Sequence, residues 1–291
     1  MDDITELYCY VDDFYQSVKE QIHNSMISKD KKSRNRQTML SISEIITLVL
    51  LFHTSRFRQI KKFYQYVGIF LRKEFPRLPS YNRFIELMPR CTVFLTVLFG
   101  SLKGQCTGIS IVDSTPLAVC DNRRISRHKV FAGCAERGKS STGWFFGFKL
   151  HVIINHLGEI LSARLTAGNI DDRKPLVDMV NNINGQLYAD KGYLSNALKE
   201  QLKDMGISLI TKVRRNMKAV THTPFEKAVL SKRSVIETVF DELKNLCQIE
   251  HTRHRSISNF VVNLLSGLVV YCLMEKKPRL AVKSLTTVFT A

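Results

Sequence analysis

The chain has 291 residues, 44% of them hydrophobic, which is enough for two modest domains, or one α/β domain with an appendage, around a real core. Its 43 lysines and arginines against 26 acidic residues give a formal net charge of +17. This surplus favours nucleic acid or an anionic lipid surface as partner, because basic side chains displace counterions from phosphates. Seven scattered cysteines argue against a disulfide framework or a zinc site, and the acidic start Met-Asp-Asp-Ile is unlike a signal peptide.

The first hundred residues are predicted to be helical. The expected helices are 7–22, one starting near 41, 57–73 and 81–88. Ser41 followed by Glu44 predicts a capping box at the start of an apolar, buried helix, and the basic run 29–36 predicts a solvated loop. Short helices with one basic face are typical of a helix-turn-helix DNA reader, and equally of an ordinary bundle with a basic exterior. We expect residues 1–100 to form a helical domain that binds DNA.

From about residue 105 the pattern changes to strands alternating with helices. Strands are expected at 108–113, 145–154, 159–166, 186–190 and 208–213, and helices at 174–183, at 195–205 and from 231. The order β-β-β-α-β-α-β-α predicts an α/β fold with a mixed sheet flanked by helices over residues 101–291. The uncharged stretch 256–274 approaches the length of a membrane span, but its serine, asparagine and glycine residues predict a buried helix of a soluble protein.

Two aspartates follow apolar strands. Asp113 comes after Ile111 and Val112, and Asp190 comes after a predicted strand that ends at Ala189. If the two strands are neighbours in one sheet, the carboxylates approach each other and repel unless cations neutralise them. Oxygen ligands favour hard ions, so Mg²⁺ or Mn²⁺ is the expected guest.

A third carboxylate lies on the helix predicted from residue 231. On a helical wheel Arg233, Glu237 and Lys244 fall at roughly 0°, 40° and 20°, so they share one face. Such a stripe is either a surface ladder of ion pairs or a metal ligand between two phosphate-binding side chains. The spacing alone leaves both interpretations open.

Five motifs occur in order along this region. They are Ile-Val-Asp-Ser-Thr-Pro at 111–116, Gly-Phe-Lys-Leu-His at 147–151, Gly-Asn-Ile-Asp-Asp at 168–172, Tyr-Ala-Asp-Lys-Gly-Tyr at 188–193, and Arg-Ser-Val-Ile-Glu at 233–237 with Lys244 beyond. With them, 113–244 resembles the catalytic domain of bacterial insertion-sequence transposases of the DDE type. The chain departs from the family's pattern at Leu230, where the family has a tyrosine.

The resemblance implies an RNase H-like fold in which Asp113, Asp190 and Glu237 are catalytic and hold two Mg²⁺ or Mn²⁺ ions. It also implies that Arg233 and Lys244 bind DNA phosphates. The partners would be the terminal inverted repeats of the element and a target DNA, bound by a homodimer or a higher oligomer. We expect no membrane association, and a cytoplasmic location on the nucleoid of a prokaryote.

Other residues of this region allow two interpretations each. The segment 121–143 is a DNA-contacting loop or a solvated connector, and we expect DNA contact through its basic residues, including Arg123, Arg124, Arg127 and Lys129. Asp172 either supports the site or caps the next helix, and His151 either lines the site or is a hydrogen-bonded sheet residue. Trp144 is expected to pack in the core rather than stack on a displaced base.

The sequence therefore predicts a transposase that cuts DNA at the ends of its own element and joins the 3′-ends to a target. A metal-dependent nuclease without strand transfer is one alternative. A catalytically inactive DNA-binding derivative is the other, and the presence of all three carboxylates argues against it.

Overall fold

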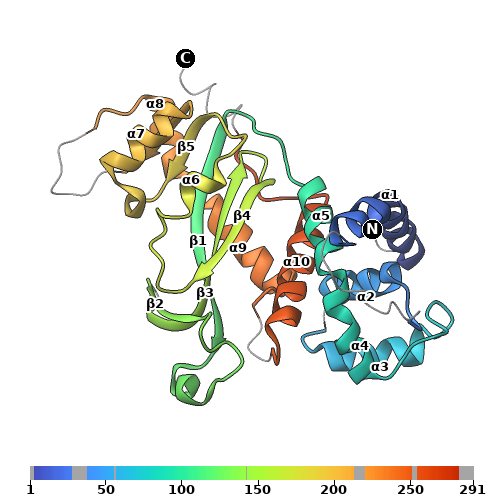
Figure 1. Cartoon of the computed structure of the whole chain (residues 1–291). Coiled ribbons are helices and arrows are strands. Elements are labelled where there is room, and N and C mark those ends of the chain that lie inside the picture. The colour runs from blue at the N-terminus through green and yellow to red at the C-terminus, as the bar shows by residue number, and fades with distance from the viewer. Residues whose placement is uncertain are drawn as a thin grey trace. The chain divides into compact units, whose positions relative to one another are not determined.

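Figure 1 shows the computed structural model of the chain, which describes residues 3–27, 38–55, 57–141, 143–212, 220–250 and 254–281. The chain forms two compact units. The first comprises Met1–Leu102, Leu243–Ile249 and His254–Leu273, and the second comprises Lys103–Glu242, Glu250–Arg253 and Met274–Ala291. The predicted basic loop 29–36 lies outside the described residues.

The first unit is helical. Its elements are α1 (Ile4–Ile27), α2 (Ile42–Thr54), α3 (Ile60–Phe70), α4 (Tyr81–Leu87), the 3₁₀ turn η1 (Met88–Cys91), α5 (Thr92–Ser101) and α10 (Ile257–Leu273). The predicted capping box is confirmed: Ser41 Oγ accepts from the Glu44 N–H at 3.1 Å, and the Glu44 carboxylate accepts from the Ser41 N–H at 2.6 Å. This cap fixes the start of α2, whose apolar side chains form the core of the unit.

Helix α10 is the buried helix predicted over 256–274, but it lies in a different unit from the one expected. It packs against α2 and α5 instead of joining the sheet. A Cβ at Gly267 would lie 2.3 Å from the Ile249 side chain and 2.9 Å from the Cys247 carbonyl oxygen, so glycine lets the backbones approach. His53 Nδ1 donates to that same carbonyl at 2.6 Å. The sequence shows that α10 must be buried, and tertiary packing determines against which partner.

The run Tyr81–Ser101, which comprises α4, η1 and α5, is long and apolar enough to cross a membrane by length and composition alone. Core helices of soluble proteins meet the same criterion. Here Phe84, Leu87, Leu95 and Leu98 are fully buried inside the helical unit.

The second unit is built on a mixed sheet. Its strands are β1 (Ile109–Cys120), β2 (Glu136–Ser140), β3 (Gly143–Asn155), β4 (Ile160–Ala167), β5 (Gly185–Ala189) and β6 (Ile207–Thr211), in the order β2-β3-β1-β5-β6 with β4 also beside β3. β1 and β4 pair antiparallel with β3, whereas β1–β5 and β5–β6 are parallel. The mixed α/β class predicted from the sequence is therefore observed, and β1, β3 and β4 run side by side in Figure 1.

Helices complete the second unit. They are α6 (Leu176–Met179), α7 (Asn196–Asp204), α8 (Pro224–Ser231) and α9 (Val235–Asp241), with 3₁₀ turns η2 (Asn122–Arg127) and η3 (Lys191–Tyr193), and a π-helical turn at Glu242–Leu246 follows α9 in the chain. Leu176, Leu198 and Leu202 are buried in one cluster with Leu187 and Leu209 of the parallel strands. This packing holds the strand ends from which the predicted site projects.

Three elements differ from the sequence expectation. β1 does not end at Asp113 but continues to Cys120, because antiparallel pairing with β3 extends the strand. The connector predicted over 121–143 contains an additional strand, β2. The helix expected from residue 231 begins only at Val235, as α9, and the preceding helix α8, which ends at Ser231, was not predicted.

Candidate active site

The sheet register brings the two predicted aspartates together. β1 and β5 pair in parallel as far as Ile111 and Tyr188, and Asp113 and Asp190 each lie two residues beyond this last pair. Both side chains therefore start where the parallel ladder opens. Asp113 remains in β1, where β3 still holds it through the Asp113–Val152 pair, whereas Asp190 is the first residue after β5. The Asp113 side chain is 22% exposed and the Asp190 side chain 47%.

Arg233 lies in the turn before α9 and gathers the three predicted carboxylates around one guanidinium. Its Nη1 donates to Asp113 Oδ2 at 2.8 Å, while its Nη2 lies 3.9 Å from Asp190 Oδ1 and 4.0 Å from Glu237 Oε1. The interruption between α8 and α9 therefore places Arg233 toward the sheet. Glu237, in the first turn of α9, is 65% exposed and approaches the cluster from the solvent side.

The cluster concentrates opposing charges in a partly buried place. Burial raises the pKa of Asp113, the contact with Arg233 opposes this rise, and the charge of Asp190 adds to it. Burial alone would lower the pKa of Arg233, but the carboxylates of Asp113, Asp190 and Glu237 raise it overall. The pKa of Asp113 is thus raised even with Arg233 beside it, and a further cation here would favour its ionised form.

The donor set fits a hard divalent cation. Asp113, Asp190 and Glu237 present only carboxylate oxygens, which are the ligands that Mg²⁺ and Mn²⁺ prefer. Within the described residues, no three His, Cys, Asp or Glu side chains are grouped closely enough to bind a metal as they stand. In this structure the Arg233 guanidinium lies within 4.0 Å of all three carboxylates and supplies positive charge between them.

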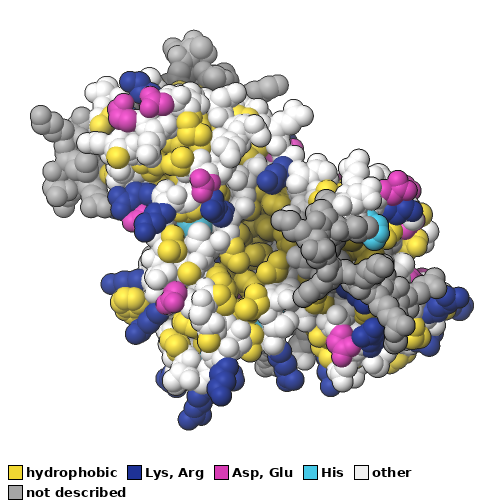
Figure 2. Space-filling view, in the orientation of Figure 1, with side chains coloured by type: hydrophobic (Ala, Val, Ile, Leu, Met, Phe, Trp, Pro, Cys, Tyr) yellow, Lys and Arg dark blue, Asp and Glu magenta, His cyan; other side chains and the backbone are white. Residues whose placement is uncertain are grey.

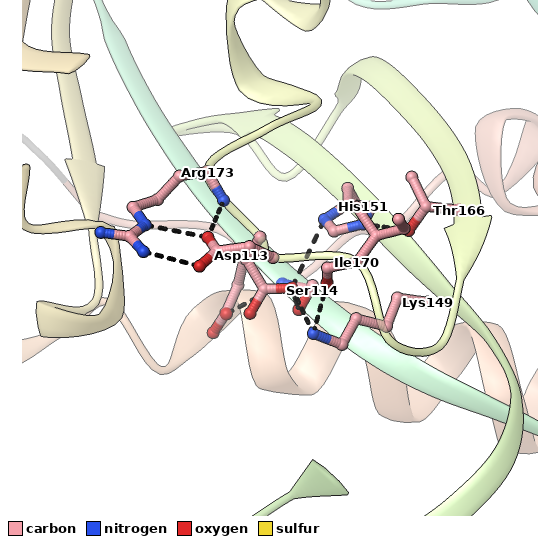
Figure 3. Close-up of polar contacts among 9 residues, drawn as sticks. Asp113, Ser114, Lys149, His151, Thr166, Ile170 and Arg173 are labelled. Carbon is pink, nitrogen blue, oxygen red and sulfur yellow. Dashed lines mark hydrogen bonds and ion pairs between the residues drawn. The ribbon is translucent and has the colours of Figure 1, made fainter. Parts of the chain in front are cut away.

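A second polar cluster adjoins Asp113 and is centred on Asp172. Asp172 Oδ1 accepts from Ser114 Oγ and from Lys149 Nζ, both at 3.0 Å, and lies 3.9 Å from His151 Nδ1. Figure 3 shows Lys149 and His151 of β3 directed toward the region beside Ser114 of β1. Asp172 does not cap the next helix, whose N-cap is Pro175, so the helix-cap interpretation is wrong.

His151 is almost completely buried and joins this cluster to β4. Its Nε2 and Thr166 Oγ1 share a hydrogen bond of 2.8 Å. Burial lowers the pKa of His151 to about 4; Asp172 opposes this shift, and the charges of Lys149 and Arg164 add to it. His151 is therefore neutral at neutral pH, and it is the hydrogen-bonded sheet histidine that the sequence left as one of two interpretations.

Tyr193 is a site residue to which the sequence interpretation gave no role. It ends η3, is 2% exposed, and its hydroxyl has no hydrogen-bond partner within the described structure. Burial raises its pKa well above the usual value, and the charges of Asp113 and Asp172 add to this rise. A buried hydroxyl without a partner among the described residues is costly, so Tyr193 calls for an explanation at this site. The sequence did contain a signal for this residue, since Tyr193 is the last residue of the motif at 188–193.

A sequence profile described as a transposase DDE domain matches residues 103–257, more than half of the chain. The chain belongs to this transposase family. The resemblance drawn from the five motifs is thereby confirmed, while an origin in a bacterial insertion sequence remains a prediction.

Two solved transposase structures match this chain in a structural comparison. A piggyBac transposase synaptic complex with hairpin DNA shares 9% identity over 89% of this chain and 73% of its own, with a TM-score of 0.46. A Mos1 mariner paired-end complex with Mn shares 11% identity over 88% and 85%, with a TM-score of 0.26. Both scores are below 0.5, so the family assignment rests on the sequence profile. No curated protein matches the sequence significantly.

The predicted DNA-binding side chains of the transposase are distributed over both units. Those in and next to η2 are exposed: Arg123, Arg124, Arg127 and Lys129. Arg233 faces the acidic cluster in this structure. Lys244 lies in the π-helical turn, in a segment that belongs to the first unit. Phosphate contact by these residues remains a prediction.

Proposed function

We propose that this chain is the transposase of a mobile element that binds the element's terminal repeats, cleaves the DNA strands there and transfers the 3′-ends to a target. The observation that supports this most directly is the convergence of Asp113, Asp190 and Glu237 on one cation in a chain of the DDE family. We include in the proposal an RNase H-like fold for the second unit, a homodimer or higher oligomer on DNA, and a cytoplasmic location on a prokaryotic nucleoid.

In this proposal the three carboxylates hold two Mg²⁺ or Mn²⁺ ions. When bound, such ions activate the attacking hydroxyl or water and stabilise the leaving oxygen of an in-line displacement at phosphorus. Asp113 is the fixed member, because β1 and β3 hold its backbone and Ser114 donates its N–H to the Asp113 carboxylate at 2.8 Å. Glu237 is the most exposed member, with 65% of its side chain in solvent.

The neighbouring residues position this centre. Lys149 of β3 and Ser114 of β1 hold Asp172, and Lys149 also donates to the Ile170 carbonyl oxygen at 2.9 Å. These bonds fix the segment after β4 against both strands. Arg233 neutralises the carboxylates and is the side chain best placed to exchange them for a substrate phosphate, where its planar donors bind two oxygens.

The test is cleavage and joining of a DNA that carries the element's own ends, in Mg²⁺ or Mn²⁺. Asp190→Ala and Glu237→Ala are expected to bind DNA normally and to lose cleavage by at least about a thousandfold, since each removes a ligand of the reacting centre. Asp178→Asn is the matched control, because Asp178 is a surface carboxylate of the same unit, 63% exposed and paired with Arg164, and it should retain full activity.

Three outcomes would contradict the proposal in different ways. A triad variant with near-normal cleavage would show that the wrong carboxylate is assigned. Cleavage without joining would favour a metal-dependent nuclease. A wild-type protein that binds DNA without metal and never cleaves it would favour an inactive DNA-binding derivative.

A further inference from the structure

The hairpin of β2 and β3 exposes the only tryptophan of the chain. The Trp144 side chain is 52% exposed, so the expectation that it packs in the core is wrong. Its place in the hairpin explains this, because Trp144 pairs directly with Lys139 near the turn, beyond the part of β3 that β4 covers. Asn122 Nδ2 donates to the Trp144 carbonyl oxygen at 2.7 Å and ties the hairpin to η2.

Two cations lie over the indole ring. Arg137 Cζ is 4.8 Å and Lys139 Nζ 5.8 Å from the ring centroid. Arg137 and Lys139 are two residues apart on β2, so they project from the same face as their cross-strand partners Phe146 and Trp144. An exposed aromatic ring and two positive charges therefore share one surface.

The opposite face of the hairpin is packed against the protein. A Cβ at Gly138 would lie 2.2 Å from the Gly168 carbonyl oxygen and 2.7 Å from the Phe145 ring. Phe145 is buried, in contrast to its neighbour Trp144. This close packing fixes the orientation of the hairpin, so the exposed position of the indole is set by the fold.

The surroundings of the ring carry further positive charge. Four exposed basic residues lie in or just after η2, in the segment to which the Trp144 carbonyl is hydrogen-bonded: Arg123, Arg124, Arg127 and Lys129. In Figure 2 a hydrophobic side chain stands between Lys or Arg side chains at the left edge of the molecule, near the position of β2. Cations that follow a phosphate backbone, together with an aromatic face for a base, are the chemistry by which proteins hold single-stranded nucleic acid.

We propose that Trp144 stacks on an unpaired base of the bound DNA while Arg137 and Lys139 contact the phosphates on either side of that base. This site rests on the proposed function, because it takes DNA as the partner, and it adds recognition of an unpaired nucleotide to it. Stacking tolerates any base, since every base has a π-face. The hairpin would therefore recognise unpaired DNA rather than a particular base sequence.

Because Trp144 is the only tryptophan, the intrinsic tryptophan fluorescence of the full chain reports on this ring alone. Titration with a thymidine oligonucleotide of about 20 nucleotides, a length that exceeds a single-strand site, is expected to quench the emission in step with binding followed by anisotropy. A blunt duplex of the same length is expected to bind and to quench much less, because its bases are stacked on one another.

Variants separate stacking from charge. Trp144→Ala is expected to weaken single-strand binding by about 5- to 150-fold and to leave duplex binding within about threefold, whereas Trp144→Phe retains most of the single-strand affinity. Lys139→Gln is expected to weaken both and to reduce the dependence on salt by about one phosphate contact. Leu157→Ala, which removes another exposed apolar side chain, 41% exposed and in the same unit, should change neither affinity.

Unchanged emission when the oligonucleotide is bound, or single-strand affinity that Trp144→Ala leaves intact, would overturn the stacking proposal while DNA binding stands. Failure of the wild type to bind either DNA would instead overturn the proposed function. Should Trp144→Ala not fold, the wild-type fluorescence titration and Trp144→Phe still decide between stacking and phosphate contact alone.

Discussion

Replacing Arg233 with glutamine removes the cation around which Asp113, Asp190 and Glu237 gather. Two of the three pairs are worth little, because the Asp190 and Glu237 side chains are 47% and 65% exposed and water screens each to at most about 1 kcal/mol. The contact with Asp113 is different, since the two side chains are only 16% and 22% exposed. Loss of one partner from such a pair costs roughly 3–5 kcal/mol.

The lower limit applies here, because both side chains of this pair remain partly exposed to solvent. We therefore expect Arg233→Gln to destabilise the second unit by about 3 kcal/mol, which lowers its Tm by about 6–12 °C. Trp144 is the only tryptophan and lies in the second unit, so tryptophan fluorescence during thermal unfolding reports this unit separately from the helical one.

Divalent cations provide the decisive comparison. If the three carboxylates form a metal site, Mg²⁺ at about ten times its dissociation constant should return roughly 1.4 kcal/mol, or about 3–6 °C, to Arg233→Gln. The gain in the wild type should be smaller, since the guanidinium competes for the same oxygens. The control is Arg164→Gln, whose ion pair with Asp178 is 45% and 63% exposed. It should lower the Tm by no more than about 2–4 °C and show no added response to Mg²⁺.

Arg233→Gln unfolding at the wild-type temperature would refute the gathering of carboxylates around this residue. A normal loss of stability with no extra response to Mg²⁺ would refute the metal site instead. The change in Tm tests the ion-pair cluster and the response to Mg²⁺ tests the metal site, and neither measurement depends on catalysis.

Three further predictions concern single residues of the second unit. Tyr193→Phe removes a buried hydroxyl with no hydrogen-bond partner in the described structure, so it should leave stability unchanged or raise it by up to about 1 kcal/mol. Strand cleavage should nevertheless fall at least about tenfold, and full activity would exclude a role for the hydroxyl. Burial lowers the pKa of His151 to about 4, below its unfolded value near 6.5. The free energy of unfolding, measured by urea titration, should therefore fall by about 3 kcal/mol as the pH is lowered from 6.5 to 4. His151→Gln should flatten this pH profile. Gly147→Ala should cost roughly 3 kcal/mol by chemical denaturation, because its Cβ would lie 2.1 Å from the Leu117 carbonyl oxygen, and a loss under 1 kcal/mol would show that β1 moves aside easily.

Local signals in the sequence determined several elements correctly. The Ser41–Glu44 capping box and the apolar run behind it specify where α2 begins, because a cap depends on residues only three positions apart. The same kind of signal was present at Thr223 and Glu226, where the structure has a second complete capping box at the start of α8. The sequence interpretation passed over this signal and therefore did not predict α8.

The common helical face predicted for Arg233, Glu237 and Lys244 depended on a helix that begins two residues after Arg233. A helical wheel relates Arg233, Glu237 and Lys244 only while the helix is continuous. The turn at 232–234 contains neither glycine nor proline, so composition gave no warning of the break. As a result Arg233 lies with Asp113 instead of on an outward stripe, and its first partner is a carboxylate of another element.

What the sequence by itself determined is most of the helices and strands and the acidic residues at their ends, since these follow from periodicity, caps and motifs within short stretches of chain. What only the tertiary structure decided is which distant side chains meet and which remain in solvent. The contact of Asp172 with Lys149 and Ser114 belongs to this second group, as does the exposure of Trp144. So does the hydroxyl of Tyr193, which has no hydrogen-bond partner among the described residues. Each depends on strand pairing across many residues, and the burial of a side chain is a property of its neighbours in space rather than of its neighbours in the chain.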